Sequence, residues 1–180
     1  MRGSTIARNY AEALLSLARK ADDLEGWGEY ISAVADAVEG DPRLRNFLAA
    51  PQISGADKNR VIEKAFADYL PRPMMRFLQK LVLNRRQTLI PQVAVEYAGL
   101  VDEVSNRVHA QVTLARDASD SDRSEIAAQL SKVMGKEVVP HLFVNPAILG
   151  GIVVRVGDRV MDGSVRKRLS TLRGKLANIR

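Results

Sequence analysis

The sequence contains no cysteine and no long apolar run, and both absences limit what the protein can be. Without cysteine there is no disulfide framework and no thiolate chemistry. No segment approaches the ~18 apolar residues that a membrane-spanning helix needs, so we expect any membrane association to be indirect, through partners. The N-terminal apolar residues are spaced for one helix face rather than run together, and they do not predict a signal peptide.

The residues and motifs of common active sites are also scarce. His109 and His141 are the only two histidines, and they fall on different predicted strands with no cysteine or carboxylate at metal-ligand spacing. There is no G-x-x-x-x-G-K-[ST] loop, and no G-x-G-x-x-G follows a strand. The pair Gly150-Gly151 favours a tight bend over a phosphate cradle. We therefore expect no catalytic residue, no metal and no cofactor, and a protein that is not an enzyme.

Acidic residues are missing from the last segment of the chain. Residues 163–180 hold six bases and no acid, which equals the whole net charge of +6: Arg166, Lys167, Arg168, Arg173, Lys175 and Arg180. Charge is segregated elsewhere too, with seven acids and no base over 22–41 and five bases and no acid over 72–86. This layout is typical of docking to charged partner surfaces, although solvated helix faces have the same composition.

Aromatic residues make up only 5% of the chain, and none lies within 163–180. Base stacking on the basic end of the chain therefore has no platform, and no RNP-type motif occurs in the predicted strands. A basic α+β protein that binds RNA phosphates through its last helix is the alternative to the function inferred below. The main expectation is a protein that binds no nucleic acid.

The first half of the chain predicts six helices with short breaks between them. In the first helix the spacing predicts one buried face, which comprises Ile6, Tyr10, Leu14, Leu17, Ala21 and Leu24. A second stripe of small residues, Ala7, Ala11 and Ala18, can seat either a neighbouring helix or an outside partner. The later helices begin at caps and prolines, among them Asp41-Pro42, a capping box at Ser54 and Asp57, and Pro71.

Beyond Arg107 the apolar pattern changes to the alternation of half-buried strands. Residues 108–114 and 138–144 alternate in this way, and Pro140 either restricts the second strand to a sheet edge or makes it irregular. Between them a helix opens at Asp120 or Ser121 and ends at Gly135.

The last part of the chain predicts a hairpin and a helix. Two apolar runs flank Gly157-Asp158, which is a two-residue hairpin turn. A final helix follows the cap Asp162-Gly163-Ser164, and its apolar residues are expected to face inward: Val165, Leu169, Leu172 and Leu176. The predicted fold class is mainly α, with an N-terminal six-helix bundle over 1–106 and a small α+β domain over 107–180.

Three stretches together resemble the delta subunit family of the F-type ATP synthase, whose mitochondrial member is the oligomycin-sensitivity-conferring protein. The most specific stretch is NPAILGGIVVRVGD at 145–158, continued by VMDGSV at 160–165. The others are LVLNRR at 81–86 and ARNYAEAL at 7–14. One departure is Asn145, where the family commonly has aspartate.

The resemblance implies a stator subunit, present as one monomer per complex at the cytoplasmic face of the bacterial inner membrane. A mitochondrial form would normally carry a transit peptide, which favours the bacterial location. In the family the bundle grips the N-terminal helix of an alpha subunit between its first and fifth helices. Carried onto this chain, that groove comprises Ala7, Ala11, Leu15, Ala18, Met75, Gln79 and Val82. The C-terminal part contacts the b subunits of the peripheral stalk, and the stalk-facing residues would be Gly150, Gly151, Arg166, Arg168 and Arg173.

Overall fold

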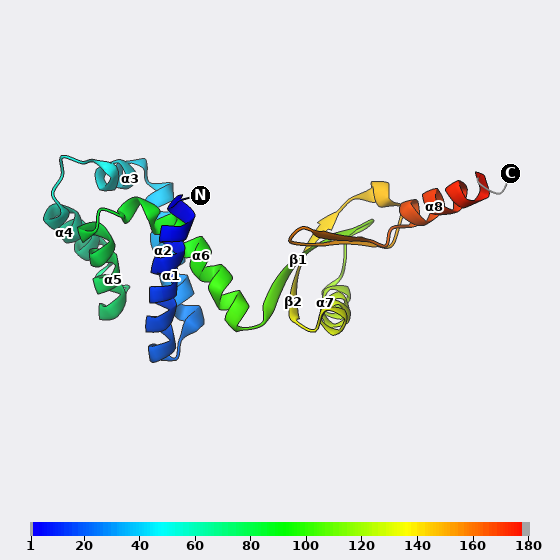
Figure 1. The fold of residues 1–180 in the computed structure, drawn as a ribbon, viewed down its shortest axis with the longest axis horizontal. Helices are drawn as coiled ribbons and strands as arrows, with labels where there is room; N and C mark the ends of the chain where they lie inside the picture. The colour runs from blue at the N-terminus through cyan, green and yellow to red at the C-terminus, as the bar shows by residue number, and fades with distance from the viewer. Residues whose placement is uncertain (1, 178–180) are drawn as a thin grey trace. The chain divides into compact units, whose positions relative to one another are not determined.

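A computed structural model describes the backbone of residues 2–177 and the side chains of residues 5–174. The chain divides into two compact units, Met1–Asp102 and Glu103–Arg180. The division falls in the last turn of helix α6 (Ile90–Val104), shortly before Arg107, where the alternating pattern begins. Figure 1 follows the chain through both units. The predicted fold class, mainly α with a helical part followed by a small α+β part, is confirmed.

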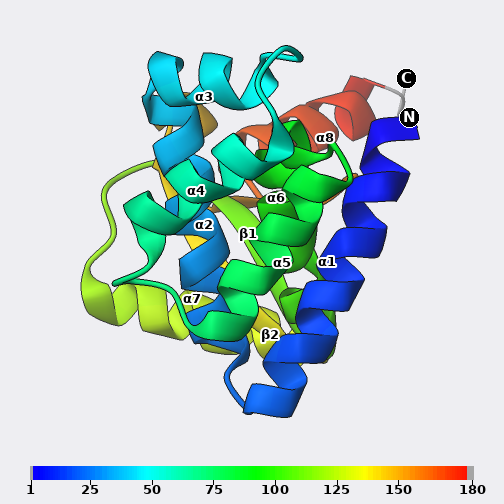
Figure 2. The ribbon, with the colours of Figure 1, turned by 90° about the vertical axis from the view of Figure 1, so that its left-hand side faces the viewer.

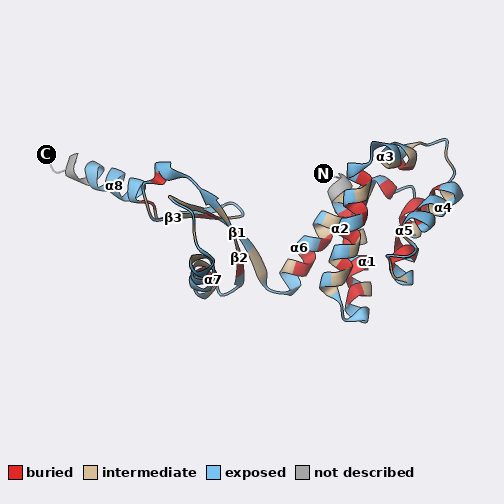
Figure 3. Ribbon diagram, turned by 180° about the vertical axis from the view of Figure 1, so that it is seen from behind, coloured by how far each residue is buried: buried red, intermediate tan, exposed pale blue. Residues whose placement is uncertain are grey.

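The first unit is built from helices that share one apolar core. They are α1 (Arg2–Ala21), α2 (Leu24–Gly40), α3 (Pro42–Ala49), α4 (Gly55–Phe66), α5 (Arg72–Leu83) and α6, with the 3-10 turn η1 (Gln87–Leu89) before α6. Figure 3 shows the buried faces of these helices turned toward one another. Burying one leucine contributes about 1.5–3 kcal/mol. Packing, more than helix propensity, therefore holds such short helices.

Leu24 lies in α2 and not in the first helix, so the predicted length of the first apolar face was wrong. The carboxylate of Asp23 accepts a hydrogen bond from the backbone N–H of Gly26 at 2.9 Å and caps α2. Asp22 turns the chain between the two helices with a φ of 53°. The side chain of Leu24 still packs on the core. The spacing of apolar residues therefore continues across the turn between α1 and α2, and it could not reveal where the first helix ends.

Tyr97 ties α6 to α2. Its ring is fully buried, and its hydroxyl donates a hydrogen bond to the backbone carbonyl of Leu24 at 2.8 Å. Burial, and secondly the negative charge of Asp23, raises the pKa of Tyr97 to about 12. The phenol therefore stays protonated at any ordinary pH, and the donor of this interhelix bond is preserved.

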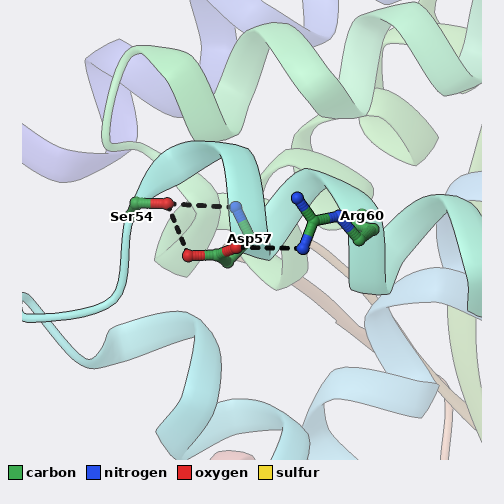
Figure 4. Close-up of polar contacts among 3 residues, drawn as sticks. All are labelled: Ser54, Asp57 and Arg60. Carbon is green, nitrogen blue, oxygen red and sulfur yellow. Dashed lines mark hydrogen bonds and ion pairs between the residues drawn. The ribbon is translucent and has the colours of Figure 1, made fainter.

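The start of α4 departs from the expected capping box. Figure 4 shows that Ser54 Oγ accepts from the backbone N–H of Asp57 at 3.1 Å and donates to the Asp57 carboxylate at 2.7 Å. The other carboxylate oxygen of Asp57 lies 3.3 Å from Arg60. The Asp57 carboxylate is thus bound by the Ser54 hydroxyl and by Arg60. Only one of the two capping-box hydrogen bonds forms, the one that Ser54 Oγ accepts from the backbone of Asp57. A complete capping box occurs instead at Ser119 and Asp122.

The second unit is a four-stranded sheet with one helix packed on one face. Its elements are β1 (Arg107–Leu114), α7 (Asp120–Met134), β2 (Glu137–Val144), the turn η2 (Pro146–Ile148), β3 (Ile152–Val156), β4 (Arg159–Asp162) and α8 (Val165–Ala177). The strand order is β2-β1-β3-β4. β1 and β2 are parallel, and the other two pairings are antiparallel. The α7 side chains Ile126, Leu130 and Met134 pack on Ala110, Val112, Val138 and Val154.

Three local predictions in this unit are confirmed. Pro140 lies on β2, which is an edge strand, so its missing N–H removes no bond from the centre of the sheet. Gly135 ends α7 with a φ of 66°. Gly157, with a φ of 53°, stands in the turn between β3 and β4. The turn and breaker residues therefore set the boundaries of this unit.

Candidate partner-binding surfaces

The alanine stripe of α1 lies inside the first unit. Ala7, Ala11 and Ala18 are fully buried, and Leu15 is 7% exposed. On α5, Met75 and Val82 are buried and Gln79 is half-buried. The small residues could pack against a neighbouring helix or against an outside partner. In the structure they pack against neighbouring helices of the same unit. Contact of these residues with a partner stays a prediction, and in the free chain only Gln79 offers appreciable surface.

The neighbouring face of α1 is only partly covered. Ile6, Tyr10 and Leu17 are half-buried, and Ala13, which shares their face at three- and four-residue spacing, is exposed. The sequence pattern assigned the first three to the buried face. Both stripes have helical spacing, so periodicity alone could not decide which of them points to the centre of the bundle.

Tyr10 joins this face of α1 to α5. Its ring meets the ring of Phe77 edge-on, with centroids 6.3 Å apart and planes at 75°. Its hydroxyl oxygen accepts a hydrogen bond from the side-chain amide of Asn84 at 2.8 Å. Figure 2 shows the two helices side by side. We give the name α1/α5 groove to the surface that these two helices share, after the feature that the family resemblance predicts there. It comprises the partly covered or exposed residues Ile6, Tyr10, Ala13, Leu17 and Asn84, together with Phe77.

Basic side chains lie on the solvent side of α5. The predicted row Arg72, Arg76 and Lys80 is exposed on that helix. The α1/α5 groove thus combines apolar side chains from α1 with positive charge nearby on α5. This combination suits an amphipathic helix that carries acidic residues beside its apolar face.

The last helix does not bury its apolar stripe, so the inward orientation predicted for it was wrong. Val165, Leu169 and Leu172 are 38%, 53% and 56% exposed. Figure 3 shows α8 exposed along its described length. Helical periodicity had identified the stripe, but no other element of this unit covers it among residues 103–174. The side chains of Lys175 and Leu176, and Arg180 as a whole, lie outside the described residues.

Three arginines flank the apolar stripe of α8. Arg166, Arg168 and Arg173 are exposed. At 100° per residue, Arg166 and Arg173 project on one side of the stripe and Arg168 on the other. An apolar seam with charged borders is the arrangement by which helices pair with other helices. This surface is called the α8 seam below.

The double glycine holds the start of α8 in place. The carbonyl of Gly150 accepts a hydrogen bond from the N–H of Val165 at 2.9 Å. A Cβ on Gly151, whose φ is 74°, would stand 2.4 Å from the carbonyl oxygen of Gly163. Only glycine permits this approach. The structural role of Gly150 and Gly151 is therefore to position the helix, and contact with a stalk partner stays a prediction.

Asp162 and Ser164 form the cap of the same helix. The Asp162 carboxylate accepts from the N–H of Ser164 at 3.0 Å, and Ser164 Oγ accepts from the N–H of Lys167 at 3.1 Å. Hydrogen bonds from the side chain and then the backbone of Ser164 lower the pKa of Asp162. Both side chains therefore serve to cap α8. This agrees with their prediction as cap residues.

A hollow of about 650 Å³ lies between α7 and the loop before β3. Its apolar lining includes Leu114, Ile126 and Ile152, and acids stand at Asp117, Asp122 and Glu125. Leu149, which also lines it, is 67% exposed and has a φ of 66°, an unfavourable backbone conformation for leucine. Sequence reasoning missed this hollow because its lining comes from separate segments.

The family comparison agrees with the motifs. A family model described as the ATP synthase delta (OSCP) subunit matches residues 6–176. The chain belongs to this family. The match covers both units, so the delta family accounts for the helical bundle and for the α+β part together.

Curated delta-family relatives are similar over their full length. An ATP synthase subunit delta from Gemmatimonas aurantiaca is 54% identical over 180 residues, covering 100% of this chain and 97% of the relative. One from Desulforamulus reducens is 35% identical over 176 residues, covering 98% and 97%. A chain in the cryo-EM structure of the Toxoplasma gondii mitochondrial ATP synthase hexamer has a TM-score of 0.60 at 22% identity, covering 95% and 97%. That likeness shows a shared fold.

One departure from the delta-family pattern keeps the same local structure. Asn145 stands where the family commonly has aspartate, and its side-chain oxygen accepts a hydrogen bond from the N–H of Ala147 at 3.0 Å. It therefore caps η2 as an aspartate would. Across the described residues, no helix is long and apolar enough to span a bilayer, and no group of three or more histidines, cysteines or carboxylates converges.

Proposed function

We propose that this delta-family chain is a non-catalytic stator subunit of an F-type ATP synthase. It links the N-terminus of an alpha subunit on the catalytic headpiece to the b subunits of the peripheral stalk. It acts as one monomer per complex, peripheral to the membrane on its cytoplasmic side. The observation that carries the proposal is that each of two compact units leaves apolar side chains of one of its helices partly or largely uncovered.

The α1/α5 groove supports the first contact. An amphipathic helix laid along it can cover Ile6, Ala13 and Leu17 without displacing the core, because the alanine stripe behind them is already packed. The basic row on α5 then favours a partner with acidic residues beside its apolar face. Of the residues expected from the family, Ala7, Ala11, Leu15 and Ala18 lie in the core beside this face of α1. On α5, Met75 and Val82 are also in the core, with Val82 close to Gly55 of α4, and Gln79 is half-buried.

The α8 seam supports the second contact. Its apolar side chains are more than one third exposed, and covering them on binding is favourable by about 25 cal/mol per Å². Arg166, Arg168 and Arg173 select a partner helix with acids on both sides of its own seam. Because Gly150 and Gly151 fix the start of α8, the seam is held at a defined place on the second unit.

A stator must resist torque and needs no chemical step of its own. Two contacts on one chain raise the effective concentration of each partner for the other site, so the release of one contact leaves the connector in place. The coupling of proton flow to ATP synthesis then depends on how long both contacts last.

The first test is calorimetric titration of the full chain with a peptide that copies the alpha-subunit N-terminus. We expect one-to-one binding that Ala13→Glu abolishes, because the new carboxylate stands in the groove. The control Arg43→Gln changes the charge by the same amount at an exposed position on α3 and leaves binding intact. Trp27 is 3% exposed, so its fluorescence is a poor direct reporter of the groove.

Two outcomes would contradict the proposal. Absence of peptide binding, with salt-sensitive binding to RNA, would favour the phosphate-binding alternative. A second test divides the chain: residues 1–106 should bind the alpha peptide and fail to bind b subunits. If this fragment is folded and does not bind the alpha peptide, the assignment of the two units is wrong.

A further inference from the structure

The two histidines of the chain meet on the sheet of the second unit. His109 lies on β1 and His141 on the neighbouring parallel strand β2. His109 Nδ1 and His141 Nε2 are 2.9 Å apart, with ring centroids separated by 5.0 Å. In the register His141 pairs with Gln111, so the two rings meet diagonally across the ladder. Both side chains are exposed.

The pair stands on the sheet face opposite α7. Val108, Ala110 and Val112 of β1 point into the α7 core, so the alternating residues of β1 point the other way. The ion pair between Arg107 and Glu137, 3.3 Å, occupies the end of the same face. Arg155 of β3 pairs with Gln111 and also points to this face. The histidines thus form an accessible pair of nitrogen ligands on a rigid pair of strands.

We propose that His109 and His141 form a two-histidine binding site for Zn²⁺. Imidazole nitrogens bind zinc at about 2.0–2.1 Å, so two of them on one tetrahedral ion stand about 3.3 Å apart. The observed 2.9 Å separation reaches that value after a shift of a few tenths of an ångström. The exposed rings can make it by rotation about χ2, which is a soft torsion in histidine. Water completes the coordination.

The proton balance of binding is simple. In the hydrogen-bonded pair one ring nitrogen donates and the other accepts. On zinc, His109 would carry its proton on Nε2 and His141 on Nδ1, so that His109 Nδ1 and His141 Nε2 each direct a lone pair at the ion. Zinc takes the place of the hydrogen between the two rings, which moves to the outer nitrogen of the donor ring, or to water if that nitrogen is already protonated, and no co-reactant is needed.

The bound ion would clamp the sheet edge. β2 is an edge strand and contains Pro140, which pairs with Ala110 and has no N–H to donate. A zinc ion joining His109 to His141 would add a cross-link between β1 and this edge strand. The site therefore stabilises the second unit when zinc is present, and this role does not rest on the proposed stator function.

The test is titration of the untagged full chain with ZnCl₂ against a chromophoric chelator. The chain has two histidines and no cysteine, so any imidazole site must use this pair. We expect one zinc ion per chain, lost in His109→Gln and in His141→Gln. Asp158→Asn, which removes an exposed carboxylate from the β3–β4 turn, should bind zinc as the parent does.

A second readout separates binding from misfolding. Zinc should raise the unfolding temperature of the parent and of Asp158→Asn, and leave that of both histidine variants unchanged. Circular dichroism of the variants without zinc should match the parent, because both rings are exposed. Zinc binding that persists in both histidine variants, or the absence of saturable binding by the parent, would overturn the site.

Discussion

The side-chain amide of Asn84, at the end of α5, donates a hydrogen bond to the hydroxyl of Tyr10 on α1 across 74 residues of sequence. The same tyrosine packs edge-on against Phe77. One side chain thus holds together the two helices that border the proposed alpha-subunit groove.

Tyr10→Phe should weaken the junction of α1 and α5. The variant keeps the ring contact and removes the hydroxyl, so we expect a loss of about 0.5–1.5 kcal/mol in the free energy of unfolding. Urea unfolding followed by circular dichroism measures it. The control is Tyr69→Phe on a side chain that is 77% exposed, where no change is expected. If Tyr10→Phe and Tyr69→Phe lowered the free energy of unfolding equally, the hydrogen bond between Tyr10 and Asn84 would not be the cause of the loss.

Ala11→Leu should destabilise the first unit. Ala11 is fully buried, and inserting a larger side chain into a packed core costs about 1–3 kcal/mol. Ala13→Leu makes the same change two residues later on an exposed position of α1 and should leave the thermal midpoint nearly unchanged. If Ala11→Leu folds as stably as the parent, the alanine stripe does not seat a neighbouring helix.

Gly151→Ala should destabilise the second unit and displace the start of α8. The added Cβ would meet the carbonyl of Gly163, and the φ of 74° adds strain. We expect a loss of about 1–3 kcal/mol in denaturant unfolding. Gly99→Ala is the control, because that position in α6 is open. There alanine should stabilise the helix by about 0.5–1 kcal/mol.

Acid should destabilise the start of α7 through Asp122. Hydrogen bonds from the backbone and side chain of Ser119 lower the pKa of Asp122 from its ordinary 3.8. Its stabilisation is therefore complete above that value and disappears as the pH falls through the lower folded-state pKa. Asp122→Asn should flatten this part of the stability curve, measured by urea midpoints at falling pH. Asp158→Asn in the β3–β4 turn provides the matched charge change outside the α7 cap, and an equal flattening in that variant would rule out the cap as the cause.

Leu172→Asp should abolish binding to a peptide that copies the end of a b subunit. Leu172 is 56% exposed in the free chain, so the substitution should not lower folding stability. Thr171→Asp adds the same charge to an exposed position away from the α8 seam and should bind normally. Calorimetry with both variants decides the matter, and unchanged binding of Leu172→Asp would place the stalk contact elsewhere.

Much of the local structure could be predicted because local chemistry determines it. Asp41, Gly135, Pro140 and the Gly157-Asp158 turn act through backbone geometry and nearby hydrogen bonds, and each lies where the sequence predicted it. The candidate site was harder. The α1 stripes were both recognised, but the choice between them depends on α5, which is distant in sequence.

The sequence by itself determined the helical and alternating segments, their caps, the charge of the last helix and the family. Spacing, caps and charge depend on residues within a few positions of one another. The tertiary structure alone decided that Ala11 lies in the core, that Leu169 stays exposed and that His109 meets His141. Each of these depends on which distant segments pack together, since burial and ligand geometry are properties of the assembled fold.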